Sequence, residues 1–199
     1  MIHRRRFILM VAMLGAAVLS SPAPAPPADR LDPTEAKLKA SYLLNFIRFT
    51  EWPADAFEAK DASLVIGLIG DDPMHEFIDR MMRGRRVHGR SVRVKRIRVE
   101  GTRVAAVEGS PGFATRLRSC HVVVVPADLP RVCRQVPSLV RGAPVLTVGE
   151  DRAFIDCGGM LSIIRRSNRV AFVANAEVIR RSPISVSSKL LRLAASLSR

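Results

Sequence analysis

Histidine and cysteine are the residues of this sequence whose chemistry could support catalysis or metal binding. The four histidines, His3, His75, His88 and His121, lack the His-Glu-x-x-His and Cys-x-x-Cys spacings that are typical of metal sites. His121 directly follows Cys120, but neighbours in a strand point to opposite faces, so the two do not readily form a nucleophile pair. The sequence therefore predicts a protein that is not an enzyme and has no metal or cofactor.

Two glycines and two carboxylates lie at the end of one expected strand. Gly67-x-x-Gly70 lacks the third glycine of a dinucleotide fingerprint and the Gly-Lys-Ser/Thr of a phosphate-binding loop. Asp71 and Asp72 could hold a divalent ion, but capping of the following helix is the simpler role, because carboxylates are favoured at a helix N-terminus. We expect neither nucleotide nor metal at this position.

The three cysteines are the candidate disulfide or redox residues. They are Cys120, Cys133 and Cys157, and an odd number leaves at least one thiol outside any internal pair. Every pairing of two among the three is compatible with the sequence. Three cysteines are also too few for a disulfide scaffold.

The chain is strongly basic, with 32 Lys and Arg against 18 Asp and Glu and a formal net charge of +14. Ten of these basic residues lie between Arg80 and Arg103, where Glu100 is the one acid. No aromatic residue is interleaved for base stacking, so nucleic acid is not an expected partner. An anionic membrane surface, an acidic partner surface and a solvated face are all compatible with this segment.

Residues 1–28 have the pattern of a secretory signal peptide followed by a Pro/Ala lead-in. Arg4, Arg5 and Arg6 precede the apolar run 7–19, and small residues with proline follow. The run is short for a membrane span. We therefore expect an exported protein, periplasmic in a bacterium, with one domain over 29–199.

The remaining pattern predicts strands and helices in alternation. Strands are expected over 64–70, 91–99, 121–125, 144–148, 160–164 and 169–174. Helices are expected over 71–83, 112–118 and 129–140. Residues 91–99 alternate apolar and basic side chains, as an exposed or edge strand does, and 165–168 form a hairpin connection. The predicted fold is an α/β single-domain sandwich: a mixed sheet, parallel first and with an antiparallel late hairpin, flanked by helices.

Two more helices are expected at the ends of the domain. The first begins at Pro33 with Asp32 as its cap and ends near Trp52, and its aromatic residues are assigned to the core. These aromatic residues are Tyr42, Phe46, Phe49 and Trp52. The last helix is expected over 187–198, with a buried stripe made of Leu190, Leu193, Ala194 and Leu197.

An ordered set of motifs resembles the YfiR family of exported bacterial proteins. The motifs are 39–53 (KASYLLNFIRFTEWP), 70–73, Gly89-Arg90, Cys120-His121, 145–149, 158–160, 168–170, Asn175 and 187–194. This similarity runs from about Lys37 to Ala195. It implies a non-catalytic, dimeric periplasmic regulator. Such a regulator binds the periplasmic part of an inner-membrane diguanylate cyclase and represses it, which lowers cyclic-di-GMP and biofilm formation.

This sequence departs from the pattern of the family at its cysteines. The well-known members have two disulfides. Cys120 and Cys157 stand where family cysteines stand, but the strands 64–68 and 161–164 contain no cysteine to pair with them. The resemblance therefore does not imply that this protein is controlled by disulfide formation in the way usual for the family.

The predicted partner-binding surface is the segment from Asn175 to Ile184 together with the late hairpin, because Ile179 and Ile184 look exposed beside the pair Arg180 and Arg181. A helical turn that covers the core is the alternative interpretation.

Two other functions are alternatives to the regulator. One is a small-molecule sensor with its ligand in the crevice at the strand ends, near Gly70–Asp72 and Gly149. The other is an unrecognised enzyme that depends on His121 or Cys120.

Overall fold

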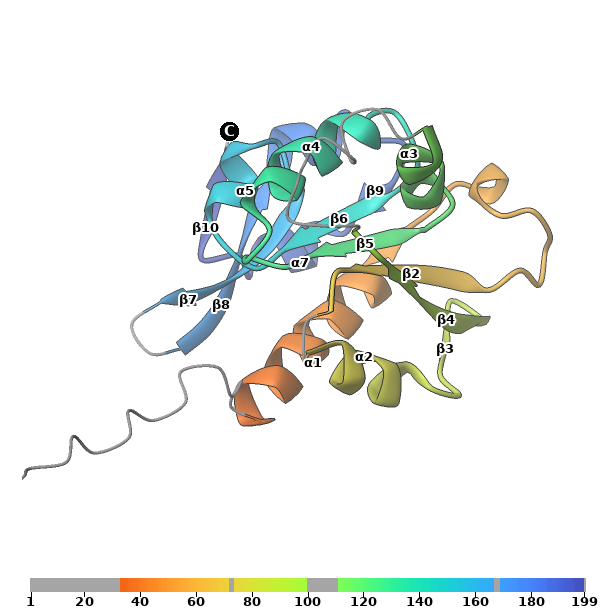
Figure 1. Ribbon diagram of the computed structural model, residues 1–199, viewed down its shortest axis with the longest axis horizontal. Helices are drawn as coiled ribbons and strands as arrows, with labels where there is room; N and C mark the ends of the chain where they lie inside the picture. Colours follow the sequence, from red (N-terminus) through yellow and green to blue (C-terminus); the bar gives the residue numbers. More distant parts are fainter. Residues whose placement is uncertain (1–32, 72–73, 100–110, 167–168, 199) are drawn as a thin grey trace, which may run out of the picture. The chain divides into compact units, whose positions relative to one another are not determined.

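The computed structural model describes residues 33–71, 74–99, 111–166 and 169–198 (Figure 1). From Leu31 onward the chain forms one compact unit. The expected signal peptide and the Asp32 cap lie outside the described residues. Within those residues, no helix is long and apolar enough to cross a membrane.

An eight-stranded mixed sheet runs through the domain in the order β10-β8-β7-β6-β5-β2-β4-β3 (Figure 1). Its strands are β2 (Leu64–Ile69), β3 (Arg86–Val87), β4 (Arg90–Ile97), β5 (Val122–Val125), β6 (Leu146–Gly149), β7 (Leu161–Arg166), β8 (Arg169–Asn175) and β10 (Ser196–Ser198). The central strands from β4 to β7 are parallel. β7 and β8 form the antiparallel hairpin. The predicted α/β fold with a mixed sheet is confirmed.

Helices cover both faces of this sheet (Figure 1). One face carries α1 (Pro33–Arg48) and α2 (Met74–Met82), and the other carries α3 (Pro111–Arg118), α4 (Pro130–Leu139) and α5 (Ala153–Asp156). Shorter elements are η1 (Ala54–Ala56), α6 (Ala176–Arg180) and α7 (Ser188–Leu191). The strands β1 (Thr50–Glu51) and β9 (Ser185–Val186) form a small antiparallel ribbon.

The central strands are apolar on both faces, as expected for parallel strands between two helix layers. In β5, Val122 and Val124 pack in the core cluster on the α1 and α2 side, and Val123 and Val125 pack in the cluster on the α3 and α4 side. Gly67 of β2 allows close packing on the second face, since a Cβ there would lie 2.7 Å from the Sγ of Cys120. The sheet is thus held by two separate cores.

The first helix is shorter than the sequence predicts. It ends at Arg48 rather than near Trp52, because Thr50 and Glu51 pair with β9 and Ser187 donates a backbone hydrogen bond to the Phe49 carbonyl. The assignment of its aromatic residues to the core holds fully for Phe46. Phe49 is 38% exposed, and Trp52 is half-buried.

The predicted helix over 187–198 is wrong. A single turn, α7, follows the cap made by Ser187, and the chain then extends into β10, which pairs in parallel with β8. Leu190 is buried as expected, but Leu193 is 71% exposed. β10 supplies hydrogen-bond partners to the outer edge of β8, and a continued helix would leave those groups unpaired.

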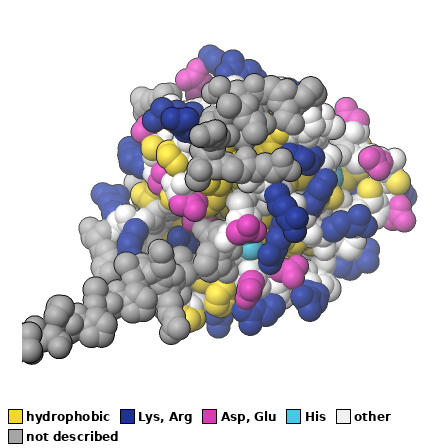
Figure 2. Space-filling model, in the orientation of Figure 1, with side chains coloured by type: hydrophobic (Ala, Val, Ile, Leu, Met, Phe, Trp, Pro, Cys, Tyr) yellow, Lys and Arg dark blue, Asp and Glu magenta, His cyan; other side chains and the backbone are white. Residues whose placement is uncertain are grey.

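Basic side chains gather on one part of the surface. Figure 2 shows Lys and Arg concentrated on the right of this face, over the region where β3 and β4 lie in Figure 1.

β4 pairs on one side with β2 and on the other with the two residues of β3. The expected edge character of 91–99 therefore holds for most of that strand.

Candidate functional site

Several motif residues that lie far apart in the sequence meet at the amino-terminal edge of the parallel strands. Trp52 follows β1, Phe57 follows η1, Arg90 begins β4 and His121 immediately precedes β5. The Trp52 indole lies edge-on to the His121 ring, with 6.4 Å between ring centroids. The Trp52 Nε1–H donates a 3.1 Å hydrogen bond to the His121 carbonyl oxygen. These contacts join the first part of the chain to the middle of the sheet.

His121 is the centre of this cluster, and both of its ring nitrogens have partners. The Val65 N–H donates to Nδ1 at 3.0 Å, so the ring proton is on Nε2, which donates to the Ala56 carbonyl at 3.0 Å. The Phe57 ring stacks on the imidazole at 4.3 Å. Burial lowers the pKa of His121, and the charge of Arg90 adds to this, while the hydrogen bond to Ala56 opposes it. A neutral ring with both nitrogens occupied fastens the η1 segment to the sheet and is not available as a general base.

Arg90 fastens the same segment from the other side. Its guanidinium carbon lies 3.6 Å from the Phe57 ring centroid. Its Nη1 donates to the carbonyls of Ala59 and Ala62 at 3.2 and 2.9 Å. A guanidinium on an aromatic face that also binds two carbonyls holds the loop after η1 in one position.

His88 connects the β3–β4 hairpin to α1. His88 and Gly89 have φ values of +52° and +75°, as the two central residues of a type I′ hairpin turn require. The His88 Nε2 lies 3.2 Å from the Ile47 carbonyl oxygen in the last turn of α1. The imidazole thus satisfies a carbonyl that the end of the helix would otherwise leave without a partner.

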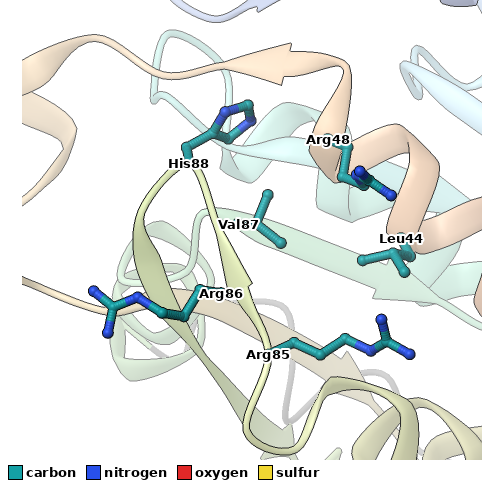
Figure 3. Close-up of a pocket in the computed structure, with 6 residues that line it drawn as sticks. All are labelled: Leu44, Arg48, Arg85, Arg86, Val87 and His88. Atoms are coloured by element: carbon teal, nitrogen blue, oxygen red, sulfur yellow. The ribbon is translucent and has the colours of Figure 1, made fainter.

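Three hollows surround this cluster. A hollow of about 340 Å³ lies between Trp52, Phe57, His88 and Arg90. A second, of about 620 Å³, lies on the α3 side and is lined in part by Arg93, Lys95 and Arg118. The third, of about 490 Å³, lies between α1 and the hairpin (Figure 3). The arrangement of rings and cations suits binding of a polar ligand or a partner side chain.

The third hollow has a basic rim. Figure 3 shows Arg48 and Arg85 extending on one side of the hairpin strand and Arg86 extending on the other. Arg86 is engaged locally, because its guanidinium donates to the Gly89 carbonyl. The Nε of Arg85 donates to the Met81 carbonyl at the end of α2. Arg85 therefore helps to hold the end of α2, and Arg86 helps to hold the β3–β4 turn.

The predicted partner-binding segment is a well-anchored turn. The Val178 N–H donates to the Asn175 side chain, which caps α6. The expectation that Ile179 and Ile184 are exposed is wrong, because both pack in the core cluster on the α1 side. The side chains of Arg180 and Arg181 are exposed, and Arg181 pairs with Glu177.

The cysteines are all free thiols in the structure. Cys120 is buried, and its thiol donates to the Arg116 carbonyl, so it has a different partner from His121. Burial raises the pKa of Cys133 to about 12, with further contributions from the nearby Asp151 and Cys157. Burial likewise raises the pKa of Cys120. The three pairings considered from the sequence stay predictions.

Apolar side chains lie against three glycines at the carboxyl ends of the strands. The strand order reverses between β2 and β5, where open α/β sheets place their ligands. There the Cδ1 of Leu129 lies 3.2 Å from the position of a Cβ on Gly70. Farther along this edge, the Phe154 ring lies within 2.4 Å of the Cβ positions of both Gly149 and Gly159. Gly70 and Gly149, which the sequence suggested for a solute, are thus in contact with apolar side chains, and Asp72 lies outside the described residues.

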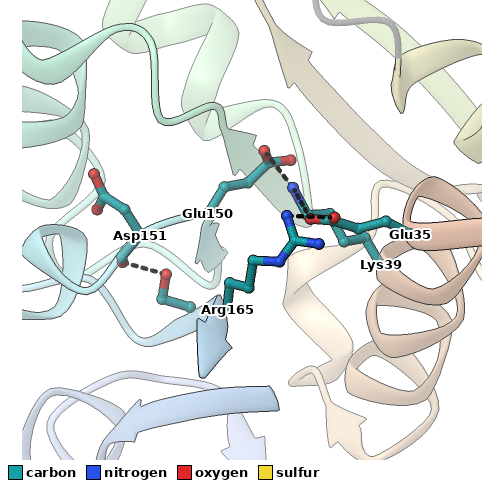
Figure 4. A network of polar contacts seen from close by, with 6 residues as sticks. Glu35, Lys39, Glu150, Asp151 and Arg165 are labelled. Carbon is teal, nitrogen blue, oxygen red and sulfur yellow. Dashed lines mark hydrogen bonds and ion pairs between the residues drawn. The ribbon is translucent and has the colours of Figure 1, made fainter. Parts of the chain in front are cut away.

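An ion-pair network lies at the same edge and joins three elements (Figure 4). The Lys39 Nζ lies 3.6 Å from Glu35 within α1 and 3.5 Å from Glu150, which follows β6. Arg165 of β7 pairs with Glu35 at 3.2 Å. In β7, the Ser162 hydroxyl also donates to the Asp151 carbonyl. This network positions α1 against the sheet.

The YfiR/HmsC-like family model matches residues 36–195. The chain belongs to the YfiR/HmsC-like family. This family is one of periplasmic, regulatory proteins. A search of curated proteins found no match.

Two solved structures resemble this YfiR-like chain in fold. A conserved domain protein of Vibrio cholerae has a TM-score of 0.58 and 10% identity over 82% of the chain. The ABC domain of Streptococcus pneumoniae, solved in complex with L-Trp, has a TM-score of 0.50 and 13% identity over 67% of the chain. The chain spans 60% and 54% of their respective lengths. At these identities the likeness shows the fold alone.

The sequence argument missed Trp52, Phe57, His88 and Arg90 as members of one cluster. Trp52 was assigned to the core by helical spacing. A signal was present, since Trp52, Gly89-Arg90 and Cys120-His121 all belong to motifs of the YfiR resemblance. Their meeting is a tertiary contact across 69 residues, which helical or strand periodicity does not encode.

Proposed function

We propose that this YfiR-like protein binds the periplasmic part of an inner-membrane diguanylate cyclase and represses it, which lowers cyclic-di-GMP and biofilm formation. The observation that carries the proposal is the family match over residues 36–195. The engaged ring nitrogens of His121 also favour a binding role over catalysis. Repression requires that the regulator bind the inactive state more tightly than the active one, and a preference of about 1–3 kcal/mol is typical of such coupling.

We propose that the cyclase contacts the turn after β8, where the side chains of Arg180 and Arg181 are exposed. Its position is well defined, because Asn175 caps α6 and the buried Ile179 and Ile184 anchor it to the core. A turn whose backbone is already held in place loses little backbone freedom on binding, which favours affinity. The proposal includes a homodimer, as in other members of the family.

The test combines cellular and purified measurements. Deletion of the gene should raise cyclic-di-GMP, and the exported protein should reverse this while a version without residues 1–28 should not. The variant Arg180→Glu/Arg181→Glu should weaken binding to the purified periplasmic domain of the cyclase by at least about tenfold. The matched control is Arg131→Glu/Arg134→Glu on α4, which makes the same charge change at exposed positions. Unchanged cyclic-di-GMP on deletion under several envelope stresses would overturn the repressor function.

The hollow between Trp52, Phe57 and Arg90 favours a second candidate, a solute-sensing domain that acts on another signalling receptor. The side chains of Trp52, Phe57 and Arg90 line a hollow of about 340 Å³, enough for a small polar solute. A rise in melting temperature with a candidate solute, lost in Trp52→Ala, would favour this function. The same rise in Trp52→Ala would count against this hollow as the binding site.

A further inference from the structure

The outer edge of β4 is largely without a partner strand. β4 pairs along six residues with β2, from Val92 to Ile97, but on the other side β3 pairs with Arg90 and Ser91 alone. The last hydrogen bond on that side runs from the Val92 N–H to the Arg85 carbonyl at 3.2 Å. Beyond it, the described part of the chain places no strand beside β4.

The direction of the exposed backbone groups follows from two hydrogen bonds. The Ile97 carbonyl accepts from the Gly70 N–H, so the backbone groups of Ile97 face β2, whereas the Val92 N–H faces β3. Alternate residues of a strand direct their backbone groups to opposite sides. Val94 and Arg96 therefore direct both N–H and C=O away from β2, into the open edge. Four backbone groups are available there to a further strand.

The side chains beside this edge are cationic. Arg93 and Lys95 point to the α3 side, where both line the hollow of about 620 Å³ with Arg118. Arg96 points to the opposite face by alternation. In the described ranges, no carboxylate lies within ion-pair distance of Arg93, Lys95 or Arg96. Figure 2 shows this region as the main concentration of basic side chains on its face.

This charge selects among possible occupants of the edge. A second copy that paired through its own β4 would bring Arg and Lys against Arg and Lys, and like charges directly opposite are destabilising in a sheet. An acidic strand would instead place carboxylates beside Arg93 and Lys95 while its backbone pairs with Val94 and Arg96. Strand addition of this kind takes its affinity from main-chain hydrogen bonds and its specificity from alternate side chains.

We propose that the outer edge of β4 binds an extended acidic segment of a partner protein, which joins the sheet as an additional strand. The site is distinct from the turn at Arg180 and Arg181. It does not depend on the partner being a diguanylate cyclase.

The probe is a fluorescein-labelled synthetic peptide of alternating valine and glutamate, and binding to the purified protein is followed by fluorescence anisotropy. Val94→Pro removes one outward N–H without touching the hydrogen bonds to β2. We expect it to weaken binding by about tenfold relative to Val94→Ala, which keeps that N–H. Equal affinities for the two variants would overturn strand addition. This holds also where a diffuse electrostatic attraction explains the binding.

Charge reversal tests the recognition of acidic residues. Arg93→Glu/Lys95→Glu should weaken peptide binding by at least about tenfold, whereas Arg131→Glu/Arg134→Glu should leave it within about twofold, because those positions lie on α4. A peptide with lysine in place of glutamate should not bind. Equal losses in the two double variants would mean that net charge alone attracts the peptide, which would overturn the proposal.

Hydrogen exchange provides a measurement that needs no variant. In the free protein the amides of Val94 and Arg96 should exchange rapidly, and the acidic peptide should protect both. The Lys95 amide faces β2 and should be protected in both states. Peptide binding without new protection at Val94 and Arg96 would overturn the proposal even if a proline variant failed to fold.

Discussion

His121 shows how a residue suited to catalysis is used for structure. Its Nδ1 accepts from Val65 and its Nε2 donates to Ala56, so one tautomer of the neutral ring satisfies both contacts. Protonation would place a second N–H opposite the Val65 N–H. The imidazolium is therefore disfavoured in the folded protein, in agreement with the lowered pKa.

This predicts a loss of stability with acid. Because the folded pKa of His121 is below its ordinary value of 6.5, the unfolded chain binds more protons at mildly acidic pH. The contribution of His121 is fully present above pH 6.5 and is lost as pH falls through the folded pKa. Urea unfolding between pH 7.5 and 5.5 should show the decline.

The variant His121→Gln is the control for this prediction. It should lower the free energy of unfolding at pH 7.5 by about 1–3 kcal/mol, because a buried hydrogen bond is lost. Its stability should change less between pH 7.5 and 5.5 than that of the wild type. A parallel decline in both proteins would show that other groups are responsible.

Among the elements, β2 and β5 were predictable and α7 and β10 were not. The run Val122–Val125 is apolar at every position. It is too short for a buried helix, so it predicts a strand that is buried on both faces. The residues from Ser187 onward fit helical spacing. The chain instead forms the strand β10, because the edge of β8 offers backbone partners to it. The candidate site was missed for a related reason, since the Trp52 contact with His121 depends on how distant elements meet.

The packing of β2 against Cys120 and Ile97 gives a prediction for one glycine. A Cβ on Gly67 would lie 2.7 Å from both the Cys120 Sγ and the Ile97 Cδ1. Gly67→Ala should therefore lower the free energy of unfolding by about 1–3 kcal/mol through overpacking. Chemical denaturation measures the change.

A double variant separates overpacking from other effects. Cys120→Ala removes one of the two clashing atoms, so Gly67→Ala should cause a smaller loss in that background. Gly84→Ala is a poor control, because its φ of +69° disfavours any side chain. An equal loss from Gly67→Ala with and without Cys120 would contradict the packing explanation.

At the scale of the whole molecule, α1 is joined to the carboxyl-end edge of the sheet by charge as well as by apolar packing. Lys39 lies between Glu35 and Glu150, and the side chains of Lys39 and Glu150 are only 14% and 5% exposed. Arg165, by contrast, contacts Glu35 with a side chain that is 63% exposed. Water screens the second pair far more than the first.

The two cations of this network should therefore differ in their effect on stability. Lys39→Met removes a largely buried cation that lies within ion-pair distance of both Glu35 and Glu150, and it should lower the free energy of unfolding by about 3 kcal/mol. Arg165→Met removes an exposed partner and should lower it by less than about 1 kcal/mol. Lys39→Met/Glu150→Gln should recover part of the loss, because the largely buried side chain that lost its ion pair with Lys39 is then neutral. Equal effects of the two single variants in urea unfolding would mean that burial does not set the strength of this network.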